Sequence, residues 1–156
     1  MDGKIRPASF SVYALRMDSL GERLLTDFSR TGRSMPTVLI VDDDDAFRRQ
    51  LRTLFERGGG FDPCAEAANG AEALDVTKRL LPELAVLDFS LPDTSGFELA
   101  QKLRAVRPEL QIFILATDYS ADIEKSAQSF GITAVFSKLD DLPTLVANAR
   151  AVCGIE

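Results

Sequence analysis

The sequence contains no histidine and no tryptophan, and only two of its 156 residues are cysteines. The lack of histidine excludes histidine-based catalysis, imidazole ligands for a metal ion and the usual side-chain pH switch near neutrality. Cys64 and Cys153 form no metal-binding or redox spacing, so we expect free thiols and a cytoplasmic location. No apolar segment approaches the roughly 18 residues of a membrane span, and the N-terminus lacks the apolar core of a signal peptide. We therefore expect no membrane insertion.

The sequence also has fewer basic than acidic residues. The chain has 18 lysine and arginine residues against 24 aspartate and glutamate residues, which gives a formal net charge of −6. Direct binding of nucleic acid requires a basic surface that faces the phosphate backbone, so we expect none. Hydrophobic residues make up 46% of the chain and charged residues 27%. These proportions are typical of a soluble globular protein, and the length suits one domain.

Residues 1–35 differ from the rest of the chain, because their apolar residues follow only a weak helical period between Val12 and Phe28. We expect an N-terminal extension over residues 1–35, disordered or weakly helical, and a folded domain over residues 36–156. The alternative for the extension is a small helix that docks on a partner.

From Pro36 onward, short apolar segments alternate with amphipathic ones. The pattern predicts strands over residues 37–41, 63–67, 84–87, 111–116 and 133–137, and helices over residues 46–57, 71–81, 96–107, 121–130 and 142–152. Asp45 is the expected N-cap of the first helix. Strands that alternate with helices form a parallel sheet covered on both faces, and right-handed crossovers leave few topologies. We predict an α/β fold, a flavodoxin-like (βα)5 doubly wound parallel sheet with strand order 2-1-3-4-5.

Acidic residues follow two strands that are neighbours in this order. The first strand ends in Asp42-Asp43, and the third strand delivers Asp88 to its tip. Ligands of such sheets bind at this edge, where the strand order reverses. Carboxylates a few Å apart repel one another unless a cation lies between them, and all-oxygen ligands suit Mg²⁺. We therefore predict a Mg²⁺ site; the alternative is a solvated loop that also caps a helix.

Lys138 follows the fifth predicted strand and belongs to the same edge of the sheet. A lysine there offers a compact positive charge to a phosphate or to an ionised aspartate. A lysine after a strand is more often solvated. What favours a role in the site is that none of the other four predicted strands is followed by a lysine.

Three segments together resemble the signatures of the response-regulator receiver domain: Val38–Asp44, Leu87–Leu99 and Phe136–Lys138. They occur in the family's order, at spacings that fit it, and the likeness covers about Pro36 to Val152. It implies that Asp88 accepts a phosphoryl group from a phosphorylated histidine on a sensor histidine kinase or a histidine phosphotransfer protein.

The resemblance also implies the ligands of the site. Mg²⁺ would be held by Asp42, Asp43, Asp88 and the backbone carbonyl of Ser90. Lys138 would pair with the phosphoryl oxygens. Phosphoryl transfer depends mainly on positioning and charge neutralisation, which this set of residues supplies.

The sequence departs from the family pattern in the residues that sense the phosphate. A count without gaps puts Ala116 where a hydroxyl residue normally ends the fourth strand, and Thr117 one place later. Val135 occupies the aromatic switch position, with Phe136 next to it, and Leu139 replaces the usual proline. Thr117 is therefore a phosphate-binding candidate beside Ala116, and Val135 and Phe136 are switch candidates.

These residues are compatible with three functions. The first is a phosphorylatable receiver in two-component or phosphorelay signalling, not an enzyme with its own output module, that acts through contacts with a downstream protein; self-association as a homodimer is open. The second is a degenerate receiver that acts as a phosphorylation-independent interaction module. The third is a Mg²⁺-dependent phosphatase of the haloacid dehalogenase type. Such enzymes carry an acid–base aspartate where this chain has Ser90, which argues against it.

Overall fold

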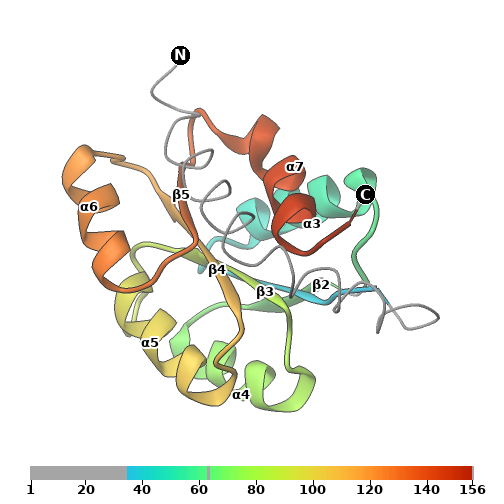
Figure 1. The fold of residues 1–156 in the computed structure, drawn as a ribbon, viewed down its shortest axis with the longest axis horizontal. Coiled ribbons are helices and arrows are strands. Elements are labelled where there is room, and N and C mark those ends of the chain that lie inside the picture. Colours follow the sequence, from blue (N-terminus) through green and yellow to red (C-terminus); the bar gives the residue numbers. More distant parts are fainter. Residues whose placement is uncertain (1–34, 63, 156) are drawn as a thin grey trace.

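Five parallel strands form the sheet of this protein, in the order β2-β1-β3-β4-β5. The computed structural model describes residues 35–62 and 64–155 (Figure 1). The strands are β1 (Val38–Val41), β2 (Cys64–Ala67), β3 (Leu84–Asp88), β4 (Gln111–Ala116) and β5 (Ala134–Ser137), and the helices are α3 (Asp45–Gly58), α4 (Gly70–Leu80), α5 (Gly96–Val106), α6 (Ala121–Ser129) and α7 (Leu142–Val152). The predicted fold class and strand order are confirmed. The predicted extension lies, apart from Met35, outside the described residues.

The sheet separates two apolar layers, which explains why β1, and β3 as far as Leu87, are continuously apolar. On β1, Val38 and Ile40 face the layer that α3 and α7 complete, whereas Leu39 and Val41 face the layer of α4, α5 and α6. Figure 1 shows α3 and α7 together on one side of the sheet and α4 and α5 on the other. Every residue of β1 is consequently buried.

The first helix begins one residue earlier than the sequence predicts. Asp44, and not Asp45, is the N-cap of α3, because Asp44 has an extended backbone and its carboxylate accepts from the N–H groups of Ala46 and Phe47, at 3.0 and 3.2 Å. Asp45 is the first helical residue, and its carboxylate pairs with Arg48 one turn later. Neighbouring aspartates have the same capping propensity, so only the backbone conformation distinguishes them.

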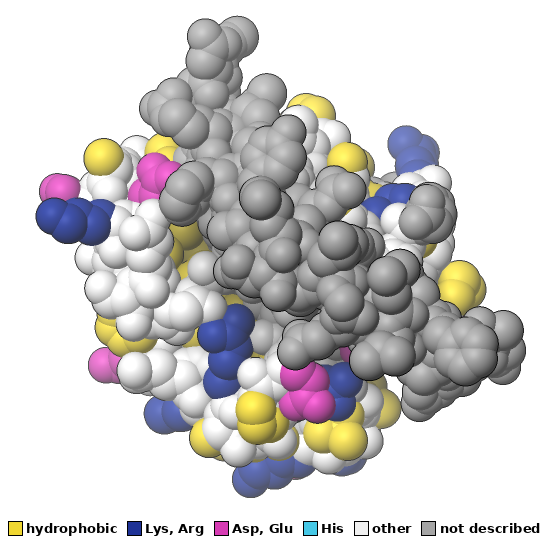
Figure 2. All heavy atoms as spheres, in the orientation of Figure 1, with side chains coloured by type: hydrophobic (Ala, Val, Ile, Leu, Met, Phe, Trp, Pro, Cys, Tyr) yellow, Lys and Arg dark blue, Asp and Glu magenta, His cyan; other side chains and the backbone are white. Residues whose placement is uncertain are grey.

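Two surface properties bear on the predicted partners. Among the described residues, no helix combines the length and the apolar character that crossing a membrane requires. On the visible face in Figure 2, basic and acidic side chains of the described residues are interspersed.

Candidate functional site

The acidic residues of two neighbouring strands meet at the carboxyl edge of the sheet. Val41 pairs with Leu87, so Asp42 and Asp88, the residues that follow them, lie side by side. Asp42, Asp43 and Asp88 each offer a carboxylate oxygen, and these oxygens lie within 4.8 Å of one another. Asp42 is buried and Asp88 is 8% exposed, whereas Asp43 is exposed. Such an all-oxygen cluster could hold a hard divalent cation.

Lys138 lies against this acidic cluster. Its Nζ is 2.6 Å from Oδ2 of Asp42 and 3.4 Å from Oδ2 of Asp88. Its side chain is only 15% exposed, so both ion pairs are largely shielded from water. The two pairs bring one positive charge to two of the three carboxylates.

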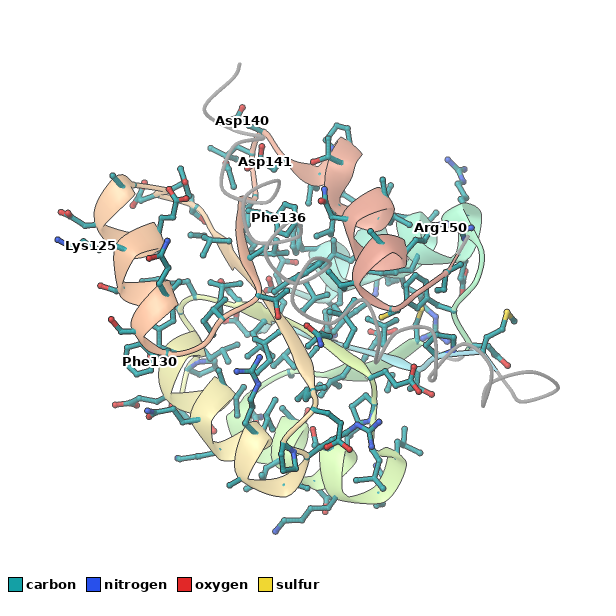
Figure 3. All side chains as sticks on the ribbon, viewed as in Figure 1. Lys125, Phe130, Phe136, Asp140, Asp141 and Arg150 are labelled. Carbon is teal, nitrogen blue, oxygen red and sulfur yellow. The ribbon has the colours of Figure 1, made fainter. Side chains whose placement is uncertain are left out.

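The residues on both sides of Lys138 fix its backbone. The N–H of Lys138 donates to the carbonyl of Ala116 on β4, at 3.0 Å. The carboxylate of Asp141, itself buried, accepts from the N–H of Ser137 at 2.8 Å. The Ser137 hydroxyl accepts from the N–H of Leu139 at 3.2 Å. These hydrogen bonds hold the backbone of Lys138 in place at the start of the loop between β5 and α7. Figure 3 labels Asp140 and Asp141 in the same loop.

The electrostatics of the site follow from its burial. Burial raises the pKa of the Asp88 carboxyl and the neighbouring Asp42 raises it further, while Lys138 and the N–H of Ser90 lower it; the net shift is upward. Burial lowers the pKa of Lys138, but the hydrogen bond and the charge of Asp42, together with Asp88, outweigh burial and raise it. Lys138 therefore keeps its charge, and the ionised form of Asp88 gains from additional positive charge.

The loop after β3 turns back tightly around Asp88. The N–H of Ser90 donates to Oδ1 of Asp88 at 3.3 Å, and Ser90 pairs with Ser95 across the loop. The N–H of Gly96 donates to the carbonyl of Phe89 at 2.8 Å. A Cβ on Gly96 would lie 2.7 Å from the carbonyl oxygen of Asp88, so this position requires glycine. Ser90, the predicted carbonyl ligand, is thereby kept beside the Asp88 carboxylate.

Asp93 ties the same loop to another helix, a contact that the sequence analysis does not predict. Its carboxylate accepts from the N–H groups of Gly70 and Ala71 at the start of α4, at 2.8 and 3.1 Å. These hydrogen bonds, that of Gly70 foremost, lower the pKa of Asp93. No sequence signal links residues that lie more than twenty positions apart in this way.

Arg48 braces the loop after β1, and it too is absent from the predicted site. Its guanidinium donates to the backbone carbonyl of Asp42 at 2.5 Å and pairs with Glu66 of β2 at 3.1 Å. Its third partner is Asp45. The Arg48 side chain is 13% exposed, so the brace is mostly enclosed.

The ring of Phe47 completes the surroundings of Lys138. The Nζ of Lys138 lies 4.4 Å from the ring centroid, in the geometry of a cation–π contact. The periodicity of α3 assigns Phe47 to the apolar stripe with Leu51 and Phe55. Leu51 and Phe55 are fully buried, while Phe47 packs against the core only in part.

The predicted sensing residues have different environments. Ala116 is the buried last residue of β4, and Thr117, just beyond the strand, is exposed. Val135 and Phe136 are both buried but face opposite sides of the sheet. Phe136, labelled in Figure 3, packs on Phe113 with 4.8 Å between ring centroids. Phosphate binding by Thr117 and switching by Val135 or Phe136 stay predictions.

Comparison with known proteins agrees with this geometry. The family model described as the response regulator receiver domain matches residues 38–150. Transcriptional regulatory protein AfsQ1 of Streptomyces coelicolor is 37% identical over 123 residues, covering 76% of this chain and 51% of that protein. Sporulation initiation phosphotransferase F of Bacillus subtilis is 28% identical over 105 residues, covering 67% of this chain and 83% of that protein.

Solved structures give the same result. The crystal structure of a two-component response regulator of the LuxR family from Aurantimonas sp. SI85-9A1 superposes with a TM-score of 0.72 at 27% identity, covering 79% of this chain and 89% of that one. The chain spans about half the length, or less, of several curated relatives that it matches.

One expectation drawn from the sequence is corrected by these comparisons. Protein-glutamate methylesterase/protein-glutamine glutaminase 3 of Paramagnetospirillum magneticum is 35% identical over 108 residues, covering 68% of this chain and 30% of that protein. Because this relative is named as an enzyme, the expectation that no output enzyme accompanies such a receiver is wrong. The physical reason is that a receiver's own fold and site carry no signal of the module to which it is joined.

Proposed function

The chain belongs to the response regulator receiver domain family of two-component signalling, and from that premise we propose that Asp88 is its phosphoacceptor. The donor is a phosphorylated histidine of a sensor histidine kinase or a histidine phosphotransfer protein. We assign the receiver to residues 36–156. The observation that carries the proposal is the position of Asp88 at the end of β3, within 4.8 Å of two further carboxylates and 3.4 Å from the Lys138 ammonium.

Transfer to Asp88 requires that its carboxylate is ionised and that the negative charge of the phosphoryl oxygens is neutralised. A carboxylate oxygen of Asp88 bonds to phosphorus while the N–P bond to the donor imidazole breaks, and its electron pair stays on the imidazole nitrogen. Lys138, held by Asp42, places its charge where the phosphoryl oxygens gather. Such a transfer depends on positioning and charge neutralisation more than on covalent participation by the protein.

Asp42, Asp43, Asp88 and the carbonyl of Ser90 are the proposed ligands of Mg²⁺. The close carboxylate oxygens and the raised pKa of Asp88 fit a hard dication with oxygen ligands. When bound, the ion supplies further neutralisation of the phosphoryl charge.

The signal is the added charge, roughly −1.5 to −2 for each phosphoryl group. A loop or helix near Asp88 changes its conformation in response to this charge and presents a changed surface to a downstream protein. Thr117 is the proposed phosphate-sensing hydroxyl, and Val135 or Phe136 the proposed switch residue. A cytoplasmic location, the absence of direct nucleic-acid binding and the option of a homodimer belong to the same proposal.

A degenerate receiver that binds partners without phosphorylation is the second candidate. It is favoured by Ala116 at the end of β4, where the family has a hydroxyl residue, and by Leu139, which is 74% exposed beside Lys138. The intact cluster of Asp42, Asp88 and Lys138 opposes it.

Intact mass after incubation with Mg²⁺ and acetyl phosphate separates the two candidates. We expect the wild type to gain one phosphoryl group and Asp88→Asn to gain none. Asp75→Asn, a matched change on the exposed face of α4, should behave like the wild type. A wild type that neither gains mass nor binds Mg²⁺ would favour the interaction module.

A further inference from the structure

The ring of Phe47, which packs in part against the core, also lies under the Lys138 ammonium. We propose that Phe47 is a positioning residue, which holds Lys138 between Asp42 and Asp88 for the phosphoryl transfer. The role rests on the proposed function, because Lys138 serves the transfer only if Asp88 accepts a phosphoryl group. The contact itself does not depend on that function.

The geometry around the ammonium carries this inference. Nζ of Lys138 is 2.6 Å from Asp42, 3.4 Å from Asp88 and 4.4 Å from the centroid of the Phe47 ring. An aromatic face attracts a cation through its quadrupole, most strongly where water is excluded. The Lys138 side chain is 15% exposed, so the ring covers a surface of the ammonium that water would otherwise solvate.

The backbone of Phe47 is fixed on both sides, which makes the ring a stable support. Its N–H donates to the Asp44 carboxylate at 3.2 Å. The N–H of the next residue, Arg48, donates to the Asp44 carbonyl at 3.0 Å, and the Arg48 guanidinium contacts the Asp42 carbonyl and Glu66. The first turn of α3 is thus tied to the loop that carries the acidic pair, and the ring keeps its place relative to Asp42.

A simpler account makes Phe47 one more apolar residue of α3. In that account a leucine of similar size would serve equally well, and the electronic character of the ring would not matter. In our account the ring must be aromatic and rich in electrons. The two accounts therefore differ in what they predict for Phe47→Tyr, Phe47→Leu and replacement by trifluorophenylalanine, which keeps the shape of the ring but weakens its quadrupole.

The first readout is the reactivity of the Lys138 amine, measured by competitive reductive methylation and peptide mass analysis without any phosphodonor. The exposed Lys125 on α6 (Figure 3) serves as the internal reference. We expect Phe47→Leu and the trifluorinated ring to raise the relative labelling of Lys138 by roughly two- to tenfold, the range of a moderate cation–π contact. Phe47→Tyr should leave it near the wild-type value.

The matched control is Phe130→Leu. Phe130 stacks on Phe97 at 4.9 Å in the opposite apolar layer, and Figure 3 shows it beside α6, away from α3. This change also removes a half-buried ring, but it should not alter the labelling of Lys138.

The second readout is the rate of phosphorylation by acetyl phosphate with Mg²⁺. We expect it to fall by a similar factor in Phe47→Leu and in the trifluorinated protein, and to stay near wild type in Phe47→Tyr and Phe130→Leu. Wild-type behaviour of the trifluorinated protein in both readouts would overturn the inference. If labelling follows the series but the wild type takes up no phosphoryl group, the contact stands, while the proposed function and the role of Phe47 in it are overturned.

Discussion

Replacing Gly96 by alanine tests how closely α5 approaches β3, the strand that carries the proposed phosphoacceptor. Gly96 is the first residue of α5, and its Cβ would lie 2.7 Å from the Asp88 carbonyl oxygen, 3.0 Å from Cδ1 of Ile114 and 3.2 Å from Cα of Phe89. Two of these three atoms belong to the backbone, which cannot rotate away. The start of α5 must therefore move away from β3, or the tip of β3 must shift.

The expected cost follows from this overlap. Overpacking of a well-packed site costs about 1–3 kcal/mol, and the better helix propensity of alanine returns at most about 1 kcal/mol. We expect a net loss of about 1–2 kcal/mol in the free energy of unfolding, which lowers the melting temperature by roughly 3–8 °C for a domain of this size. Phosphorylation of Asp88 should also slow, because the shortest of these contacts is with the carbonyl oxygen of Asp88 itself.

Urea unfolding measures the loss, with Gly70→Ala as the matched control. Gly70 is likewise the first residue of a helix, α4, but its Cβ would meet side-chain atoms of Thr94 and Asp93, at 2.7 and 3.3 Å. The nearest of these atoms is the Thr94 methyl group, at the end of a side chain that can rotate, so we expect a smaller loss than for Gly96→Ala. A Gly96→Ala protein as stable as the wild type, or more stable than Gly70→Ala, would refute the reasoning.

Three further predictions concern charge and the thiols. Lys138→Ala should still bind Mg²⁺ in a titration yet accept phosphate more slowly from acetyl phosphate, whereas Lys125→Ala should match the wild type; unchanged binding and rate would remove Lys138 from the site. Asp93→Asn should unfold at lower urea concentration than the wild type at pH 7. The pKa of Asp93 is lowered from 3.8 in the folded protein, so its ionised carboxylate stabilises the fold above that value, and this stabilisation is lost as the pH falls through the folded pKa. The difference in stability between Asp93→Asn and the wild type should therefore vanish in acid. A stability difference that persists in acid would contradict this assignment. Burial raises the pKa of the Cys64 thiol from 9.0 to about 11, so at pH 8 it holds roughly 100-fold less thiolate than a free thiol; iodoacetamide should alkylate it only after unfolding, and rapid labelling of the native protein would contradict its burial.

The fold could be predicted because its buried strands have a recognisable apolar pattern in the sequence. Strands buried on both faces must be apolar, as β1 is throughout and β4 is from Ile112 onward. The helices between the strands then leave one compact strand order. The misplaced cap shows the limit of this reasoning. Asp44 and Asp45 are chemically identical, and only the extended backbone of Asp44 makes it the N-cap.

The site was predictable to the extent that topology alone creates it. Parallel strands bring their carboxyl ends to one edge, so Asp42, Asp88 and Lys138 could be expected to lie near one another. The contacts of Phe47 and Asp93 could not be expected. These contacts depend on the direction of single side chains across segments that are distant in sequence. Phe47 also fits the apolar period of α3, so the sequence predicts a core residue there and not a contact with Lys138.

The central claim is that the carboxylate of Asp88 takes the phosphoryl group. The most direct test is to phosphorylate the protein with acetyl phosphate and Mg²⁺, reduce it with borohydride and sequence the peptide that contains residues 84–104 by mass spectrometry. An acyl phosphate on Asp88 is reduced to homoserine, so the account predicts homoserine at position 88 alone, and only in the phosphorylated sample. Homoserine at another aspartate, or at none in a protein that has gained the phosphoryl mass, would contradict it.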